Sequence, residues 1–187
     1  MASALLAAVI LFSNCEKTSP QNDPETLAAI KAGQVARGKY LMGSMGCDDC
    51  HTPKKMTPHG PEPDLERRFM GHPAAEQFEY LDKKQMIEQQ HVAVFSPGMT
   101  ATVGPWGISY AANLTPDDTG TGNWTEAQFI KAIREGKSKG LDGTRPLLPP
   151  MPWPVYATLN DEDLKSIYAF LRTVKPINNV VPNPQSW

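Results

Sequence analysis

The chain is 187 residues long, with 18 Lys and Arg against 20 Asp and Glu and a formal net charge of -2. This length suits one domain, and a hydrophobic share of 40% is normal for a globular protein. The charges nearly balance and no Lys/Arg-rich run is present, so the sequence gives no electrostatic footprint for nucleic acid and no such partner is expected.

Residues 1–15 have the features of an export signal. An apolar stretch from Ala2 to Phe12, too short to span a bilayer, is followed closely by Cys15. This order resembles a bacterial lipoprotein signal in which Cys15 is lipidated and anchors the protein to the membrane; the alternative is an ordinary cleaved signal with a spare thiol. Residues 16–24 are polar with two prolines, which predicts a flexible tether. Both alternatives place the folded domain, residues 25–187, outside the cytoplasm, in the periplasm.

A helix is predicted from Glu25 to about Gly46, because apolar residues recur there at roughly helical spacing. It leads into Cys47-Asp48-Asp49-Cys50-His51, the attachment signature of a c-type haem. Two thiols on one helical turn can each form a thioether with one vinyl group of the same porphyrin, and the imidazole one residue later then lies under the iron. We therefore expect one covalent haem c, bound through Cys47 and Cys50. His51 is the predicted proximal iron ligand, and its other ring nitrogen needs an acceptor, for example a backbone carbonyl just downstream.

Three other interpretations of the motif are possible. A structural zinc site needs four ligands, and the only other cysteine is Cys15 in the leader. A thioredoxin-like dithiol would follow a buried strand, whereas a helical pattern precedes this motif. A plain disulfide with an incidental histidine stays open on the motif alone.

The stretch from residue 56 to residue 103 is too polar for a second core and too long for a turn, so we expect a loop-rich insertion beside the haem. Its histidines, His59, His72 and His91, are the competing distal ligands. Four residues with polar or cationic tips lie in segments that could reach the haem propionates, although ordinary packing is the alternative for each. They are Trp106, Tyr110, Asn113 and Arg145.

Two more helices are predicted in the second half. One has Thr125 as N-cap with Gln128 in a capping box, and ends at Gly136. The other follows Asn160 and stops at Lys175-Pro176. Between them, prolines flank Met151 on both sides and fix most backbone angles, so this loop can hold a thioether still. Met151 is the predicted distal ligand, with a core methionine as the alternative.

The order of helix, Cys47-x-x-Cys50-His51, loops, Met151 and terminal helix resembles class I cytochrome c. The stretch from Gly107 to Pro176 is similar to one haem module of the cytochrome c subunits of membrane-bound alcohol and gluconate dehydrogenases. Its most specific motifs are Ile108-Ser109-Tyr110-Ala111-Ala112-Asn113-Leu114-Thr115-Pro116-Asp117, Gly122-Asn123-Trp124, Arg134-Glu135-Gly136 and Met151-Pro152.

The resemblance implies an all-α cytochrome c fold in which the N-terminal and C-terminal helices cross, with Gly38 allowing close contact near Ile167, Tyr168 and Leu171. It also implies an electron carrier rather than an enzyme. Such a carrier would pass electrons, through His/Met-ligated iron, between a dehydrogenase or quinol-oxidising complex and another cytochrome or an oxidase. The alternative is a haem enzyme or gas sensor with an open or displaceable distal site.

Overall fold

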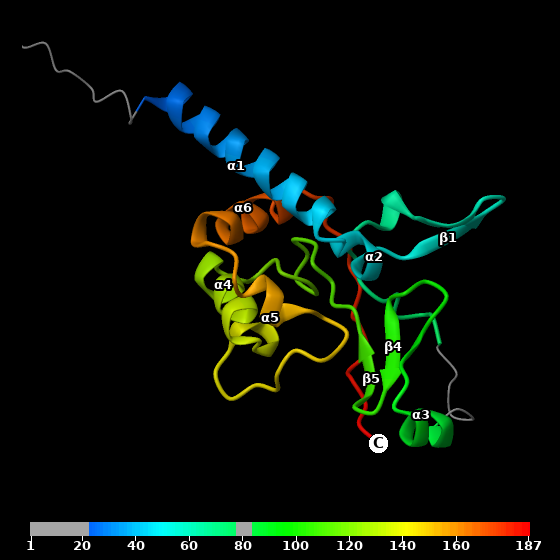
Figure 1. The fold of residues 1–187 in the computed structure, drawn as a ribbon. Helices are drawn as coiled ribbons and strands as arrows, with labels where there is room; N and C mark the ends of the chain where they lie inside the picture. The colour runs from blue at the N-terminus through cyan, green and yellow to red at the C-terminus, as the bar shows by residue number, and fades with distance from the viewer. Residues whose placement is uncertain (1–22, 78–83) are drawn as a thin grey trace, which may run out of the picture.

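The computed structural model describes residues 23–77 and 84–187 (Figure 1). The predicted leader, Cys15 and nearly all of the tether lie outside these described residues. The described α-helices are α1 (Pro24–Ser44), α2 (Cys47–His51), α3 (Lys84–Gln90), α4 (Glu126–Glu135), α5 (Trp153–Tyr156) and α6 (Asp161–Leu171). Within the described part of the chain, no helix is both long and apolar enough to cross a membrane.

α1 carries the chain to the attachment motif. Its first turn is capped by Asp23, whose side chain accepts a hydrogen bond from the Thr26 backbone N–H at 3.0 Å. The helix ends at Ser44, two residues earlier than predicted, and Gly46 then adopts a left-handed conformation with φ of 68°. This glycine turns the backbone between α1 and α2, so the motif forms a separate short helix. Figure 1 shows α1 running across α6, with its N-terminal end projecting beyond the rest of the domain.

α1 and α6 touch backbone to backbone at Gly38. A Cβ atom added to Gly38 would overlap the backbone carbonyl of Ser166 and lie 2.8 Å from Cβ of Phe170. The predicted crossing of the two terminal helices is therefore confirmed. Gly38 contacts Ser166 and Phe170, which are next in sequence to the expected Ile167 and Leu171. A glycine is required because no side chain fits at this approach.

The caps of α4 and α6 agree with the sequence prediction. Oγ1 of Thr125 accepts from the Gln128 N–H at 3.1 Å, and Oδ1 of Asn160 accepts from the Asp163 N–H at 2.7 Å. The capping box is only half formed, because the Gln128 side chain donates to the Lys139 carbonyl at 2.7 Å instead. Gly136 ends α4 in a left-handed conformation, as expected, whereas α6 ends at Leu171, before the predicted Lys175-Pro176 stop.

Two small antiparallel sheets distinguish this fold from the expected all-α domain. The first pairs β1 (Lys54–Thr57) with β2 (Gly60–Pro63), and the second has the order β3 (Val94–Phe95), β4 (Ala101–Gly104), β5 (Gly107–Tyr110). β2 and β3 lie wholly, and β1 and β4 partly, inside the stretch 56–103, which was expected to be loop-rich. The structure is therefore helical around its main core, with small sheets beside it (Figure 1). Short 3-10 turns, η2 (Leu65–Arg67) and η4 (Ser138–Gly140), complete the described elements.

The buried apolar residues form two clusters. The larger joins α1, α4 and α6 and includes Met42, Phe129 and Leu164. The smaller joins α3 to the three-stranded sheet through Ile87, Val103 and Ile108, against which Trp187 packs. The C-terminal segment reaches this second cluster because Gln185 exchanges both backbone hydrogen bonds with Ile108, at 2.7 and 3.1 Å.

The crossing at Gly38 predicts a strong position dependence along α1. Gly38→Ala places a methyl group against an α6 carbonyl that cannot move without shifting the helix, so we expect the free energy of unfolding to fall by about 1–3 kcal/mol. Gly33→Ala is the matched control, since a Cβ there meets nothing within 4 Å. It should be neutral or stabilising by about 0.4–1 kcal/mol. Denaturant unfolding of the haem-bearing protein measures both, and equal stabilities of the two variants would reject the packing.

Candidate functional site

A cavity of about 580 Å³ lies between the helical core and the three-stranded sheet. Its walls come from α1, α2, α4, α6, the loop before α5, the strands β4 and β5, and the C-terminal segment 180–184. Seven of the eight predicted site residues line it: Cys47, Cys50, His51, Tyr110, Asn113, Arg145 and Met151. Segments more than 100 residues apart in the sequence thus face one space of the size usual for a small-molecule or cofactor site.

The short helix α2 is fixed at both ends by polar contacts. The Asp48 carboxylate accepts from Arg68 at 2.6 and 2.9 Å and from Thr52 at 2.8 Å. Burial acts to raise the pKa of Asp48, but the bonds from Arg68 and Thr52 hold it below its ordinary value. Lys54 Nζ donates to three backbone carbonyls at the end of α2, those of Asp48, Asp49 and Thr52. These contacts hold the motif as one helical turn, with both thiols and the imidazole facing the cavity.

The ring of His51 is oriented by a backbone carbonyl. Its Nδ1 lies 2.8 Å from the carbonyl oxygen of Ala112, which can only accept, so Nδ1 carries the proton and Nε2 keeps its lone pair. Burial lowers the pKa of His51, which favours this neutral form. The predicted acceptor is therefore of the expected kind but lies 61 residues along the chain rather than just downstream. A neutral imidazole with a free, oriented Nε2 is the form that binds a metal ion.

The pKa values of the two thiols are raised, whereas those of reactive dithiols are lowered. Burial raises the pKa of Cys47 to about 12, and burial also raises the pKa of Cys50. Both thiols are therefore protonated at neutral pH, whereas thioredoxin-like sites depress the thiol pKa. The two sulfurs form no disulfide, and among residues 23–77 and 84–187 no group of three His, Cys, Asp or Glu side chains could hold a metal ion. The raised thiol pKa values count against the reactive-dithiol interpretation.

Met151 lies in a constrained loop on the cavity wall. Its N–H donates to the Leu148 carbonyl at 3.2 Å, and Ser109 Oγ donates to the Pro149 carbonyl, which ties the loop to β5. Flanking prolines restrict the backbone further. The Met151 side chain is partly buried and shares the cavity with His51.

The three competing histidines do not line this cavity. His59 is exposed in the β1–β2 turn, and His91 is exposed after α3. His72 is buried, and both of its ring nitrogens are engaged, Nδ1 with Thr100 Oγ1 at 2.9 Å and Nε2 with the Glu76 carbonyl at 3.1 Å. The described geometry therefore offers none of them as a distal ligand.

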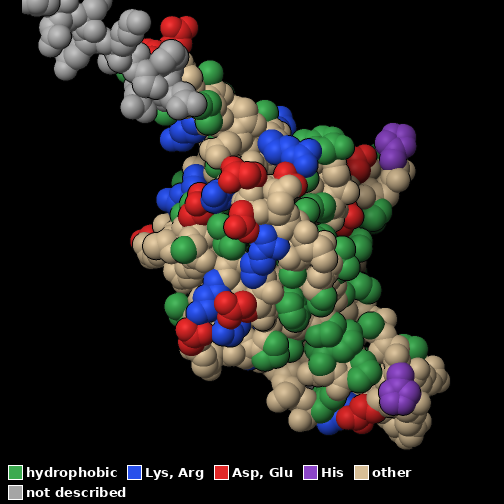
Figure 2. All heavy atoms as spheres, turned by 60° about the vertical axis from the view of Figure 1, so that its left-hand side comes forward, with side chains coloured by type: hydrophobic (Ala, Val, Ile, Leu, Met, Phe, Trp, Pro, Cys, Tyr) green, Lys and Arg blue, Asp and Glu red, His purple; other side chains and the backbone are tan. Residues whose placement is uncertain are grey.

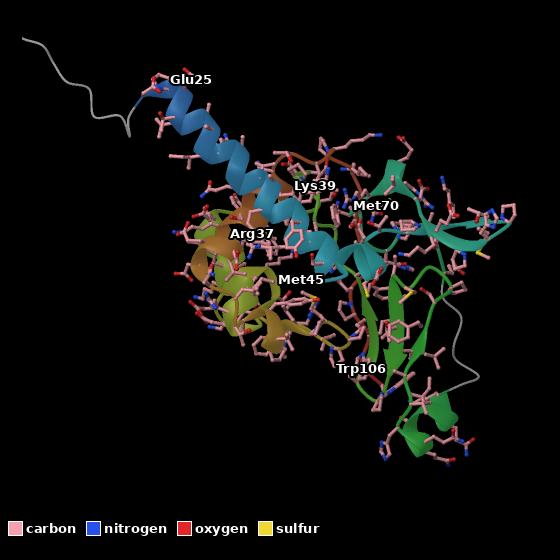
Figure 3. All side chains as sticks on the ribbon, turned by 45° about the horizontal axis from the view of Figure 1, so that its top comes forward. Glu25, Arg37, Lys39, Met45, Met70 and Trp106 are labelled. Carbon is pink, nitrogen blue, oxygen red and sulfur yellow. The ribbon has the colours of Figure 1, made fainter. Side chains whose placement is uncertain are left out.

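The four residues predicted to reach the haem propionates differ in whether they line the cavity and in whether their polar groups are already hydrogen-bonded. Tyr110 and Arg145 line the cavity, and no described carboxylate pairs with Arg145, whose Nη1 donates to the adjacent Pro146 carbonyl at 2.9 Å. Asn113 also lines it, but its amide is already bonded to the backbone of Thr115 and Ile177. Trp106 is not a lining residue: it lies at the β4–β5 turn, far from Met45 at the end of α1 (Figure 3), and its indole N–H donates to Ser109 Oγ at 3.3 Å.

Part of the cavity wall was not predicted. Thr100, Thr102 and Ser109 of the sheet region and the segment 180–184 face it, as does much of the apolar core. The acceptor on Ala112 was also missed, because every residue has a carbonyl and the sequence carries no signal for it.

Comparisons with known proteins give the chain a context. No protein-family model matches it. It is 29% identical over 187 residues to the fructose dehydrogenase cytochrome subunit of Gluconobacter japonicus, covering 99% of this chain and 30% of that protein. It is 44% identical over 75 residues to the gluconate 2-dehydrogenase cytochrome c subunit of Pantoea cypripedii, covering 39% of this chain and 16% of that protein. A diheme cytochrome c-type protein of Cereibacter sphaeroides is 27% identical over 157 residues, 83% of this chain and 41% of that protein.

The chain thus spans less than half the length of each of these relatives. All three are cytochromes, and two are the cytochrome subunits of dehydrogenases, which agrees with the prediction of an electron-carrying rather than a catalytic chain. The predicted resemblance of this chain to a haem module of dehydrogenase cytochrome c subunits is confirmed.

Proposed function

We propose that this chain is an electron-transfer protein that carries one covalent haem c with His51 and Met151 as axial ligands. The proposal rests chiefly on one observation, the convergence of Cys47, Cys50, His51 and Met151 on a single cavity. The two thiols and the imidazole come from α2, while the thioether comes from a loop about 100 residues later. When bound, the haem supplies the one-electron chemistry, and the protein supplies attachment, orientation and tuning.

The cavity residues fit such a group. The wall is largely apolar, with Met42, Phe129, Leu164, Ile167 and Leu171 among its members, as a porphyrin face requires. Cys47 and Cys50 are protonated and partly buried, so converting them to neutral thioethers adds no charge to the site. Arg145 and Tyr110 are the cavity groups that suit the haem propionates, because Arg145 is a cation with no described carboxylate partner and Tyr110 carries a hydroxyl.

Ligation by an imidazole and a thioether favours electron transfer over oxygen chemistry. Such an iron has a raised potential and no free coordination position. A haem enzyme or gas sensor would need an open or displaceable sixth position, whereas Met151 shares the cavity with His51 and can occupy that position. The geometry therefore supports the carrier over the enzyme or sensor.

A single haem is proposed because the sequence contains one Cys-x-x-Cys-His motif. The similarity to a diheme cytochrome does not argue for a second haem here, since the chain covers 41% of that protein.

The electron partners are proposed to be a dehydrogenase on one side and another cytochrome or an oxidase on the other. The fructose and gluconate dehydrogenase cytochrome subunits among the relatives support the first partner. Several lining residues at the mouth of the cavity are exposed and uncharged, including Pro149, Pro150 and Val180. Figure 2 shows hydrophobic side chains gathered on one part of the surface, beside a band of mixed charges. An apolar contact of this kind suits brief docking close to the cofactor.

We also propose that the protein works outside the cytoplasm and is held at the membrane through lipid at Cys15. Confinement by a tether raises the effective concentration of a carrier at both of its partners without any added contact.

Attachment of the haem is tested by replacing the two cysteines. Expression with a cytochrome c maturation system should yield a protein whose haem stays bound through denaturing extraction. In Cys47→Ala/Cys50→Ala, that denaturant-resistant haem should be lost completely, because no thioether can form. Haem still covalently bound in the double variant would contradict the proposal.

The distal ligand is tested by Met151→Ala. Loss of the thioether, which favours ferrous iron, should lower the reduction potential and allow carbon monoxide to bind, whereas the wild-type spectrum should not respond to carbon monoxide. Met99→Ala is the control, since Met99 also lines the cavity and should leave the iron coordination intact. An unchanged spectrum and potential in Met151→Ala would move the distal ligand elsewhere, and carbon monoxide binding by the wild type would favour the enzyme or sensor.

The lipid anchor is tested by Cys15→Ser in the native host. The wild-type protein should fractionate with membranes, and the variant should be soluble with the same haem spectrum. A soluble wild-type protein whose N-terminus lies beyond Cys15 would remove the anchor and leave the haem proposal intact.

A further inference from the structure

The Ala112 carbonyl that orients His51 belongs to a segment with no regular structure of its own. Residues 111–114 follow β5 and form neither helix nor strand. A carbonyl in such a segment keeps its direction only if neighbouring parts of the chain hold it, so the support of Ala112 decides how firmly the imidazole is bonded.

Residues 69–72 provide this support through backbone hydrogen bonds. The His72 N–H donates to the Ala111 carbonyl at 2.9 Å, and the Leu114 N–H donates to the Phe69 carbonyl at 2.8 Å. Between these two bonds, the Gly71 N–H donates to the carbonyl of His51 itself at 2.9 Å. The same short segment therefore holds the backbone of the proposed proximal ligand and the backbone on both sides of its acceptor.

Gly71 lies where no side chain fits. Its φ is +75°, and a Cβ would lie 2.6 Å from the Ala112 oxygen, with further overlap on the Ala111 carbonyl. Both obstructing groups are backbone, so they cannot turn aside as a flexible side chain would. Any side chain at Gly71 must therefore displace the acceptor carbonyl from the position in which it bonds to His51.

Asn179 fixes residues 70–74 in turn. Its Nδ2 donates to the carbonyls of Met70 at 2.7 Å and His72 at 2.9 Å, and its Oδ1 accepts from the Ala74 N–H at 3.0 Å. The Asn179 residue is 5% exposed, and its own N–H donates to Thr119 Oγ1 at 2.9 Å. Both the nitrogen and the oxygen of the Asn179 side-chain amide therefore bond to the backbone of residues 70–74, next to Ala112.

We propose that Gly71 and Asn179 are positioning residues for the proximal ligand, holding the Ala112 carbonyl against Nδ1 of His51 and thereby setting the reduction potential. This inference rests on the proposed function, because it takes His51 as an iron ligand. Donation of the Nδ1 proton to a carbonyl makes the imidazole a stronger ligand, which stabilises ferric iron. Weakening that hydrogen bond must raise the reduction potential.

The experiment compares Gly71→Ala, Asn179→Ala and the milder Asn179→Ser with the wild-type haem-bearing protein. The reduction potential is measured by redox titration, and exchange of the His51 Nδ1 proton with solvent is measured by NMR. We expect a higher potential and faster exchange at both positions, with Asn179→Ser lying between Asn179→Ala and the wild type. Should Gly71→Ala fail to fold, the two Asn179 variants decide.

Two controls separate positioning from general destabilisation. Ile87→Val removes a methyl group from the second apolar cluster at a residue that does not line the cavity, and Asn178→Ala removes the exposed neighbouring amide, whose described contact is a 3.4 Å hydrogen bond to Asp117. Both should leave the potential and the exchange rate unchanged. Folded Asn179 variants with the wild-type potential and exchange rate, or an equal shift in Ile87→Val, would overturn the inference. Failure of the proposed function is distinguishable, since it would show as a wild-type protein without covalent haem.

Discussion

The close crossing of α1 over α6 at Gly38 is the constraint on which the site depends. Backbone contact at Gly38 fixes the direction of α1, and α1 delivers the chain through the left-handed turn at Gly46 into α2. A displaced α1 would carry both thiols and His51 with it, whereas the loop of Met151 follows α4 in the chain. The packing of the first long helix against the last therefore helps to bring the two halves of the proposed ligand set together.

The side chains proposed to hold the haem are uncharged, and burial favours the uncharged form of those that can titrate. Desolvation lowers the pKa of His51 and raises that of Cys47, which stabilises the uncharged form of each. The thioether of Met151 is uncharged at any pH. The negative charge of the propionates of a bound haem would therefore be compensated by a cation of the cavity wall such as Arg145, and not by the axial ligands. A neutral ligand pair in a largely apolar cavity favours the reduced state, which suits an electron acceptor for a dehydrogenase.

Local sequence signals predicted local structure well and long-range contacts poorly. The caps at Thr125 and Asn160 and the spacing of the attachment motif depend on residues a few positions apart, and in the structure both helices begin, and the motif forms its turn, at the expected places. The acceptor for His51 could not be found this way, because it is a main-chain carbonyl brought close by tertiary packing. Trp106 has the polar tip expected of a propionate partner, but it lies in the tight turn between β4 and β5, where its indole bonds to Ser109 and does not line the cavity.

The stretch 56–103 was expected to lie beside the haem as an insertion, yet its hydrogen bonds make part of it a support for the attachment motif. Arg68 binds Asp48 near the start of α2, and the Gly71 N–H binds the His51 carbonyl at its end. The same residues 69–72 bond to the backbone on both sides of Ala112. Asn179, in the C-terminal segment, donates hydrogen bonds to the carbonyls of Met70 and His72. Variation in the exposed β1–β2 turn should therefore leave the haem environment unchanged. Variation between Arg68 and Ala74 should act on the proposed proximal ligand through these backbone contacts, although none of the residues 68–74 lines the cavity.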